Sequence, residues 1–443
     1  MKQLLAYCLS IILCVSFTGC MENYLDLYPE DKITSASFPE NESDIKLLLN
    51  GVYAQLREKE VYNQGLFGFG ITDGATPNAF NWGTDEVFNK LGAGRLSSSD
   101  GGVVTYRWKR CYEIISRANY LLACMDLVDL SEEAKAKYSG ETHFLRGLAY
   151  SVLAETYGGV PIILTDISTE EARSLKRASL EETWQQALDD YEVAITNLGV
   201  DAPEPGRATK GAALGMKMRA YLYQGKYKEV LSCVEQIDAL KKYGLFHSYE
   251  GLFDPANENN KEVLFDIHIE GENSQGSYID QYCGTGTGSW TRGSRYVPTD
   301  DLVAAYETID GSPVDPENPY ENRDPRLGFT AVLPGSYFLG YRFPNYLYPG
   351  GAFNHAGNRL KHLSTRKYRI QDESKLPPSG QSYINDIILR YADVLLSKAE
   401  AIIETNGNVA DAIAILNRIR TERDDVKISL LPTSMSREEA REK

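Results

Sequence analysis

Long stretches of the chain place apolar residues at intervals of three and four positions. This spacing runs through residues 108–122, through 145–152 and, starting near Ser179, through 184–195. Because residues at that spacing share one face of an α-helix, each stretch predicts a helix with one apolar face. A Gly-Gly-Val-Pro segment at 158–161 ends the second of these helices, since glycine and proline terminate helices.

Two further stretches each predict a pair of helices joined by a short turn. Apolar stripes at 214–222 and 227–237 flank Gly225 with the cadence of a tetratricopeptide repeat. A second pair of stripes follows at 388–402 and 412–419. A helix pair of this kind cannot bury its apolar face alone, so the pattern favours a scaffold in which such pairs stack.

The middle of the chain has a different composition. Between about 244 and 383, Gly, Pro, Asn and Tyr crowd together, and only short stretches look regular, such as a strand at 262–268 and a helix at 299–306. Loops of this length in a compact protein are usually functional or disordered. Their aromatic richness speaks against disorder and so favours a functional role.

No linker rich in Pro, Ser or charge divides the chain. We therefore expect one all-α domain at 20–443. Its helical repeat scaffold should occupy about 40–243 and 384–443, and its loop-rich ligand region about 244–383.

The amino terminus has the pattern of an export signal. Lys2 precedes an apolar run from Leu4 to Phe17, which is too short to span a bilayer comfortably. The Gly19-Cys20 pair that follows resembles the lipobox of bacterial lipoproteins. We expect residues 1–19 to be a lipoprotein signal peptide and Cys20 to be the lipidated first residue of the mature chain; an ordinary signal peptide cleaved nearby is the alternative.

Charge and residue spacing exclude several functions. The chain has 62 acidic against 46 basic residues and a net charge of −16, which argues against binding nucleic acid or adsorbing to anionic lipid. Its five histidines do not form a metal-binding spacing, and none accompanies a nucleophile elbow. We therefore expect no catalytic residue, no metal and no cofactor.

Four segments spread over almost the whole chain carry recognisable motifs. They are 20–29, 144–150 continuing through 157–161, 322–327, and 389–396 with 398–401. Together, and in this order, they resemble the SusD/RagB family of outer-membrane nutrient-binding lipoproteins.

This resemblance implies a right-handed tetratricopeptide-like superhelix that packs against an irregular loop region carrying the ligand site. It also implies a lipid anchor in the outer membrane, an outward-facing position, and a TonB-dependent (SusC-like) transporter as partner. The ligand would be an oligosaccharide or polysaccharide. Ser436 and Glu439 form a capping box that begins a helix, where the family usually continues, so we expect the chain to be truncated at its carboxy terminus.

Aromatic residues outside the helical stripes are the candidates for sugar binding. Trp108 and Trp184 lie on apolar helical faces, and we expect both to be core. A flat aromatic ring can cover the apolar face of a pyranose while polar side chains bind its hydroxyls. Two tryptophans in Asn- and Gly-rich loops, with flanking tyrosines and two polar partners, form the predicted ligand site: Trp82, Trp290, Tyr296, Tyr282, Asn81 and Asp73.

Three alternative functions remain open from the sequence. A peptide-binding member of the same family would recognise an extended backbone. A surface glycoside hydrolase would carry a carboxylate pair at hydrolase spacing. A plain repeat scaffold would bind protein along its concave face, although it would have no need of the long aromatic loops.

The anchor at Cys20 can be tested by fractionation. Cys20→Ala should move the protein from the membrane to the soluble fraction, because acyl chains supply about 0.8 kcal/mol per buried CH₂. The comparison is made in cells that lack the transporter. Unchanged membrane association of the variant there would contradict lipidation at this residue.

Overall fold

The computed structural model describes most of the chain after the amino-terminal segment. The described residues are 38–57, 73–81, 90–97, 99–101, 103–269, 296–338, 341–343, 363–368, 375 and 383–443. The predictions for the signal peptide, Cys20, Trp82, Tyr282 and Trp290 lie outside these residues.

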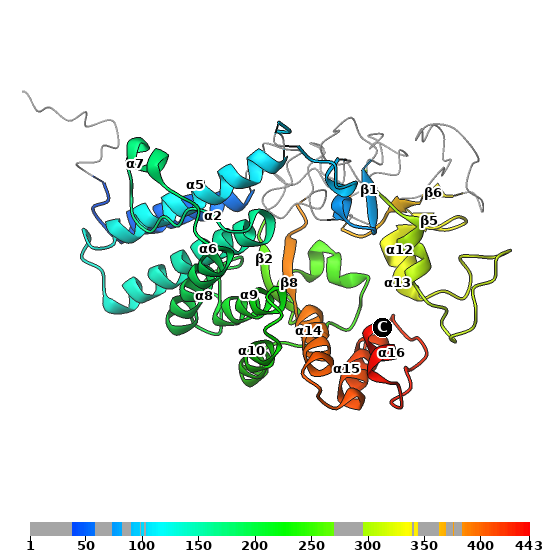
Figure 1. Ribbon diagram of the computed structural model, residues 1–443. Helices are drawn as coiled ribbons and strands as arrows, with labels where there is room; N and C mark the ends of the chain where they lie inside the picture. The colour runs from blue at the N-terminus through cyan, green and yellow to red at the C-terminus, as the bar shows by residue number, and fades with distance from the viewer. Residues whose placement is uncertain are drawn as a thin grey trace, which may run out of the picture.

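Helices dominate the described structure (Figure 1). The α-helices are α2 (Glu42–Ala54), α5 (Val103–Cys124), α6 (Glu132–Tyr157), α7 (Thr169–Ser174), α8 (Leu180–Asn197), α9 (Lys210–Tyr223), α10 (Tyr227–Ala239), α12 (Asp300–Ala305), α13 (Pro325–Thr330), α14 (Tyr391–Glu404), α15 (Val409–Thr421) and α16 (Arg437–Arg441). Single 3-10 turns are η1 (Gln55–Arg57), η2 (Asp73–Ala75), η3 (Gly251–Phe253) and η4 (Pro255–Asn257).

The strands are short and pair two by two. They are β1 (Ala79–Asn81), β2 (Val263–Ile267), β3 (Tyr296–Pro298), β4 (Ala331–Val332), β5 (Tyr337–Phe338), β6 (Tyr341–Arg342), β7 (Ser364–Thr365) and β8 (Asp386–Arg390). The pairs β1–β3, β2–β8, β4–β7 and β5–β6 are all antiparallel. Three of them join segments far apart in the chain, so they connect regions that the helices alone would leave separate.

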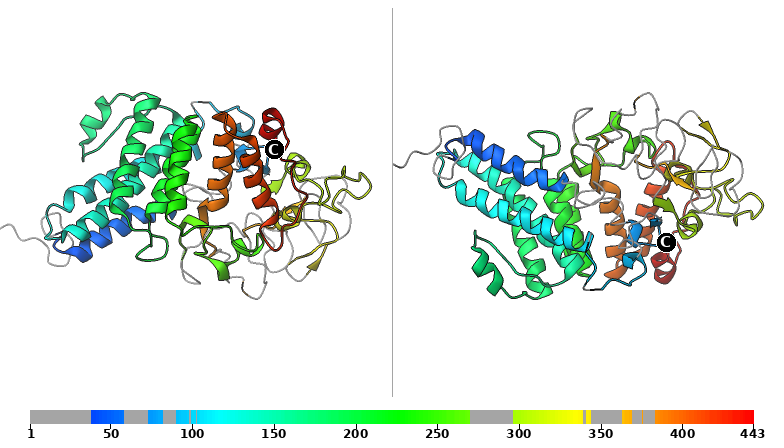
Figure 2. Two further views of the ribbon diagram at one scale, coloured as in Figure 1. Left: turned by 90° about the horizontal axis from the view of Figure 1, so that it is seen from below. Right: turned by 90° about the horizontal axis from the view of Figure 1, so that it is seen from above.

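α5 packs on α6, α6 on α8, α8 on α9, α9 on α10, and α10 on α14. Figure 2 shows α14 and α15 (orange) lying beside this group, between it and the strands β5 and β6 (yellow). The predicted helix pairs are confirmed as α9–α10, joined at Gly225 with φ 66°, and α14–α15. The first residues of the predicted 388–402 helix belong instead to β8, and α14 begins at Tyr391. The mainly helical, tetratricopeptide-like fold that the periodicity predicted is therefore confirmed.

Local sequence explains where the helices begin. Ser179 accepts a hydrogen bond from the backbone of Glu182, whose side chain in turn accepts from the backbone of Ser179, a capping box that starts α8. The predicted capping box of Ser436 and Glu439 is confirmed at α16. α6 ends where Gly158 adopts φ 73°, a conformation that favours glycine.

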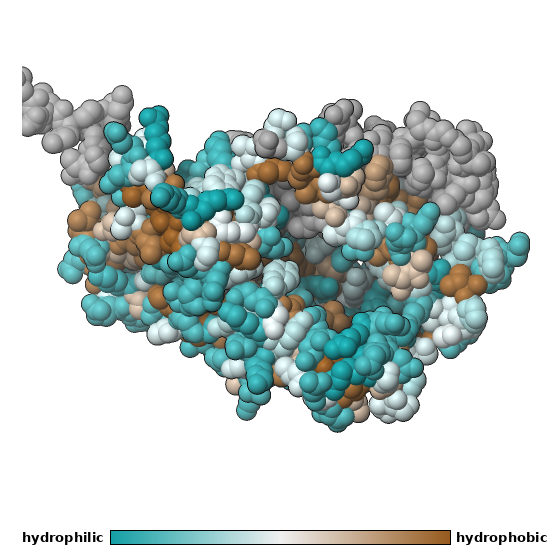
Figure 3. Space-filling view, viewed as in Figure 1, coloured by the Kyte–Doolittle hydropathy of each residue, from teal (hydrophilic) through white to brown (hydrophobic). Residues whose placement is uncertain are grey.

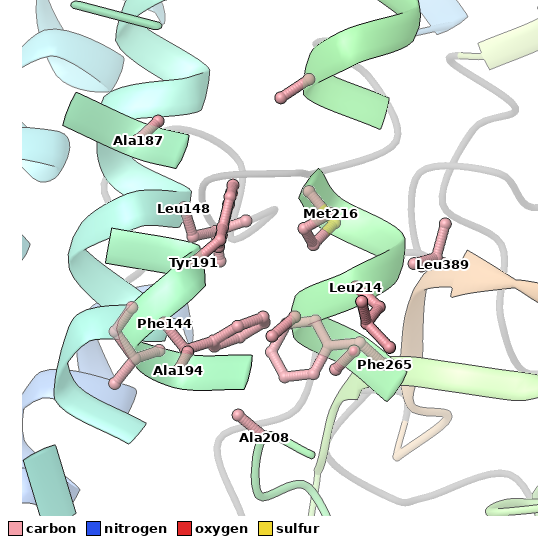
Figure 4. Packing of buried hydrophobic residues seen from close by; sticks show 14 of the residues in the cluster. Phe144, Leu148, Ala187, Tyr191, Ala194, Ala208, Leu214, Met216, Phe265 and Leu389 are labelled. Atoms are coloured by element: carbon pink, nitrogen blue, oxygen red, sulfur yellow. The ribbon is translucent and has the colours of Figure 1, made fainter. Parts of the chain in front are cut away.

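The main core lies between α6, α8, α9 and the β2–β8 pair (Figure 4). The ring of Phe144 on α6 lies 4.8 Å from that of Phe265 on β2 and 6.2 Å from that of Tyr191 on α8. Trp184 is 6% exposed, which confirms that it is core, whereas Trp108 is half-buried against the same cluster. The sheet is thus part of the helical core and not an attachment to it.

The outer faces of α10, α14 and α15 are mainly polar. On the face shown in Figure 3, hydrophilic side chains cover most of the surface over α10, α14 and α15. Among the described residues, no helix is long and apolar enough to cross a membrane.

A buried ion pair fastens the carboxy-terminal helices to the sheet. Glu262 is fully buried directly before β2, and both of its oxygens accept hydrogen bonds from Arg423, at 2.7 and 2.8 Å. Arg390, at the end of β8, donates to the same carboxylate at 2.8 Å. Burial alone would raise the pKa of Glu262, but the hydrogen bonds and charges of the two arginines hold it below its usual value.

Breaking this pair should destabilise the protein strongly. Arg423→Met leaves Glu262 with one arginine in place of two in a dry site, so the free energy of unfolding should fall by about 3–5 kcal/mol. Arg418→Met, which removes an exposed Arg–Glu pair at the end of α15, should cost about 1 kcal/mol or less. Urea denaturation of both variants measures the difference, and equal losses would contradict the role given to Glu262.

Candidate functional site

A cavity of about 270 Å³ lies where the short strands meet. Its described wall comes from η2, β1, β3, α12 and β8, and from the residues around β7. The lining residues are Asp73, Asn78, Ala79, Pro298, Leu302, Tyr306, Thr330, Thr365, Lys367, Tyr368, Asp386, Ile387 and Ile388.

The β1–β3 pair brings two distant parts of the predicted site together. Asn81 lies opposite Tyr296 in the register of this pair, although the two are more than two hundred residues apart in the chain. Asp73 lies in η2, which packs against β1, and it lines the cavity. The structure therefore brings these three predicted residues into one region, while Trp82, Tyr282 and Trp290 lie outside the described residues.

Thr299 connects this strand pair to α12. Its backbone N–H donates to the carbonyl of Asn78 at 3.1 Å, and its side chain donates to the carbonyl of Pro77. The same hydroxyl accepts from the backbone of Leu302 at 3.1 Å and so caps α12. This link sets Leu302 and Tyr306 against the cavity.

The segment 322–327, one of those that carry the family resemblance, binds the end of α12 on the side away from the cavity. The guanidinium of Arg323 donates to the carbonyl of Tyr306 at 2.6 Å. Asp324 caps α13 and pairs with Arg326 at 2.5 Å. The segment thus stabilises the fold around the cavity and does not line it.

Lys367 and Tyr368 form another part of the wall. The ammonium of Lys367 lies 4.6 Å from the ring centre of Phe253, 5.4 Å from that of Tyr368 and 5.8 Å from that of Tyr249. Tyr368 has φ 58°, a left-handed conformation that is rare for a bulky residue and tends to occur at functional sites. These contacts fix the position of the only lysine in the described wall.

The two acids of the cavity have perturbed ionisation. Burial and the neighbouring Asp266 carboxylate raise the pKa of Asp386 to about 7. Burial raises the pKa of Asp73, and the charge of Lys367 partly offsets this shift. Carboxyls with raised pKa values in a cavity are typical of functional sites.

Several residues of this wall were not predicted from the sequence. Tyr306 ends a helix that the sequence predicted, but nothing in the sequence connected it to Asp73. Asp386 reads as a charged residue before an apolar run, and Lys367 and Tyr368 lie in a loop region where no single residue stands out. Only the pairing of distant strands brings them together.

The described wall offers the chemistry of binding. Apolar groups from Ala79, Pro298, Leu302 and the β8 isoleucines face a cavity that also presents hydroxyls, carboxyls and one ammonium. Such a mixture suits a small ligand with apolar and polar faces. Across the part of the chain that the structure describes, no group of three metal-binding side chains occurs.

Comparison with known proteins adds independent information. Residues 23–222 match a family model described as "Starch-binding associating with outer membrane", and residues 261–425 match the model described as "SusD family". The curated SusD-like protein P25 of Formosa agariphila is 25% identical, with 95% of this chain and 81% of that protein covered.

Solved structures agree with these matches. A SusD-like carbohydrate binding protein from Bacteroides fragilis superposes with a TM-score of 0.80 and 26% identity over 90% of this chain and 82% of its own. A second SusD-like protein from the same species gives a TM-score of 0.77 and 25% identity over 94% and 84%. With two family models matched in order along the sequence and a shared fold over most of its length, the chain belongs to the SusD/RagB family.

Proposed function

We propose that the protein is a cell-surface lipoprotein that captures oligosaccharides and delivers them to a TonB-dependent, SusC-like transporter in the outer membrane. The observation that carries the proposal is the cavity between η2, β1, β3, α12 and β8. It lies in the region where the predicted residues Asp73, Asn81 and Tyr296 meet. Membership of a carbohydrate-binding family supports the same function.

The walls of the cavity suit a sugar ring. A pyranose has an apolar face of C–H groups and a rim of hydroxyls, and the cavity likewise combines apolar groups with hydrogen-bonding ones. Tyr306 and Tyr368 add aromatic rings. Trp82, which follows β1 in the chain, and Trp290, which precedes β3, are proposed as stacking platforms beside it, with Tyr282 flanking them.

Attachment to the membrane is proposed to occur through the acyl chains on Cys20 alone. The proposal rests on the lipobox resemblance of the first twenty residues and on the family model whose description includes association with the outer membrane. An anchor of this kind holds a folded domain at the surface without crossing the bilayer. It would keep the cavity close to the transporter that receives the sugar.

A glycoside hydrolase is the second candidate, because the cavity contains two carboxyls with raised pKa values. Hydrolases of this kind use an acid and a base or nucleophile on opposite sides of the scissile bond. The carboxyls of Asp73 and Asp386 are candidates for such a pair. The family supports binding without catalysis, and we favour that function.

Binding without hydrolysis can be tested directly. The purified mature protein is incubated with the glycans that it binds, and new reducing ends are measured. None should appear above the background of a matched Asp73→Asn/Asp386→Asn preparation. Saturable release that tracks wild-type protein and is absent from the variant would favour a hydrolase.

Glycan capture itself is tested by a glycan array on the mature protein, followed by titration of wild type and Trp290→Ala. The substitution should weaken binding by roughly 1–3 kcal/mol, on the scale of base–aromatic stacking, and leave the melting temperature nearly unchanged.

Trp184→Ala is the matched control, because this buried tryptophan should cost about 3–5 kcal/mol of stability when truncated. If no glycan on the array binds, the proposed function is wrong. If Trp290→Ala instead unfolds the protein while the folded fraction binds normally, Trp290 is a core residue.

A further inference from the structure

In the described part of the cavity wall, acidic side chains outnumber basic ones. The ionisable groups there are the carboxyls of Asp73 and Asp386, the ammonium of Lys367 and two phenols. The carboxyls come from separate segments, η2 and the start of β8. A charged ligand would therefore meet two acids and one base.

Neither acid is held in an ion pair in the described structure. The side chains of Asp73 and Asp386 receive no hydrogen bond and form no ion pair with another described residue. Carboxyl oxygens in this state can accept hydrogen bonds from the hydroxyls of a sugar. They would repel a carboxylate or sulfate brought to the same place.

Lys367, the only lysine in the described wall, contacts three aromatic rings of the protein. Its ammonium lies over the rings of Phe253, Tyr368 and Tyr249, at 4.6 to 5.8 Å from their centres. Cation–π attraction holds it there, so its position is set by the protein and not by the ligand. The ammonium of Lys367 therefore cannot readily move to pair with an anionic group elsewhere in the cavity.

The arginines of the adjoining segments are also engaged by acids of the protein. Their pairs are Arg390 with Glu262 at 2.8 Å, Arg326 with Asp324 at 2.5 Å and Arg366 with Glu250 at 2.5 Å. None of these arginines is part of the described wall.

From this arrangement we propose that the cavity selects neutral sugar residues and discriminates against sugars that carry uronate or sulfate groups. The inference rests on the proposed glycan-binding function and specifies its ligand class. An anionic ring would place a further negative charge beside the carboxyls of Asp73 and Asp386, the second of which is ionised above its pKa of about 7. In a partly buried site such charges are screened less than in water. A neutral ring would instead donate hydrogen bonds to the same oxygens.

The discrimination should grow as the pH rises from about 6 to about 8, because Asp386, with a pKa of about 7, gains its charge in that interval. Several titratable or charged groups face Asp386 or its strand from the elements packed against it. They are Asp73 from η2, Arg219 from α9, Asp266 and His268 from β2 and its end, Glu258 after η4, Tyr306 after α12, and Lys367 and Tyr368 after β7. Burial also raises the pKa of Glu258 to about 7, although it lies outside the cavity wall.

Three chemically matched ligands test the proposal. They are the neutral oligosaccharide with the strongest array signal, the same oligosaccharide oxidised at C6 to the uronate, and the methyl ester of that uronate. At about pH 8 the uronate should bind at least tenfold more weakly than the ester, which corresponds to about 1.4 kcal/mol. At about pH 6 the ratio should be smaller.

Variants show whether the two acids cause the effect. Asp73→Asn/Asp386→Asn keeps the size of both side chains, and it should reduce the uronate penalty to below threefold. Asp386→Asn alone should remove most of the pH dependence. Glu258→Gln is the control, since it removes a group of similar pKa outside the wall and should leave the pH dependence in place.

The outcomes separate this inference from the proposed function. If the array shows strong binding only to uronate or sulfated glycans, or if the uronate and its ester bind equally, the selection for neutral sugars is wrong while glycan capture stands. A penalty that persists unchanged in the double variant would also overturn it. Absence of binding to every glycan contradicts the proposed function, and this inference with it.

Discussion

The arrangement of the helical scaffold around the β2–β8 pair depends on the buried carboxylate of Glu262 and the groups that bind it. The carboxylate accepts hydrogen bonds from Arg423 after α15, from Arg390 at the end of β8 and from the backbone of Phe246 after α10. Three segments distant in the chain thus meet at one group that has no access to solvent. Because an unpaired charge there would be very costly, the ion pair specifies one relative position for these segments.

The strand β8 connects this ion pair to the cavity. The strand ends at Arg390, which is held by Glu262, and it begins at Asp386, which lines the cavity. Leu389 and Phe265 of the same strand pair are buried in the helical core. The helical scaffold therefore fixes one wall of the binding region, and the pairing of β1 with β3 supplies another from segments that have little regular structure of their own.

The sequence predicted the scaffold well and the cavity only in part. The apolar faces of helices such as α8 and α14 follow from the spacing of apolar residues within one short stretch. The capping box at Ser436 likewise depends only on two residues three positions apart. Asp73, Asn81 and Tyr296 could be proposed because aromatic and polar residues in loops are unusual. Lys367 and Asp386 could not, because they become neighbours of Asp73 through strand pairs between distant segments, and that pairing leaves no local signal.

Glycan capture as proposed requires a sugar ring to occupy the cavity formed where the helical scaffold meets the short strands. A crystal structure of the mature protein with a bound array-selected oligosaccharide tests it most directly. We expect density for a sugar ring between Asp73, Tyr306 and Asp386, with its hydroxyls within hydrogen-bonding distance of at least one of the two carboxyls. Density for the sugar on the helical scaffold, with this cavity empty, would contradict it.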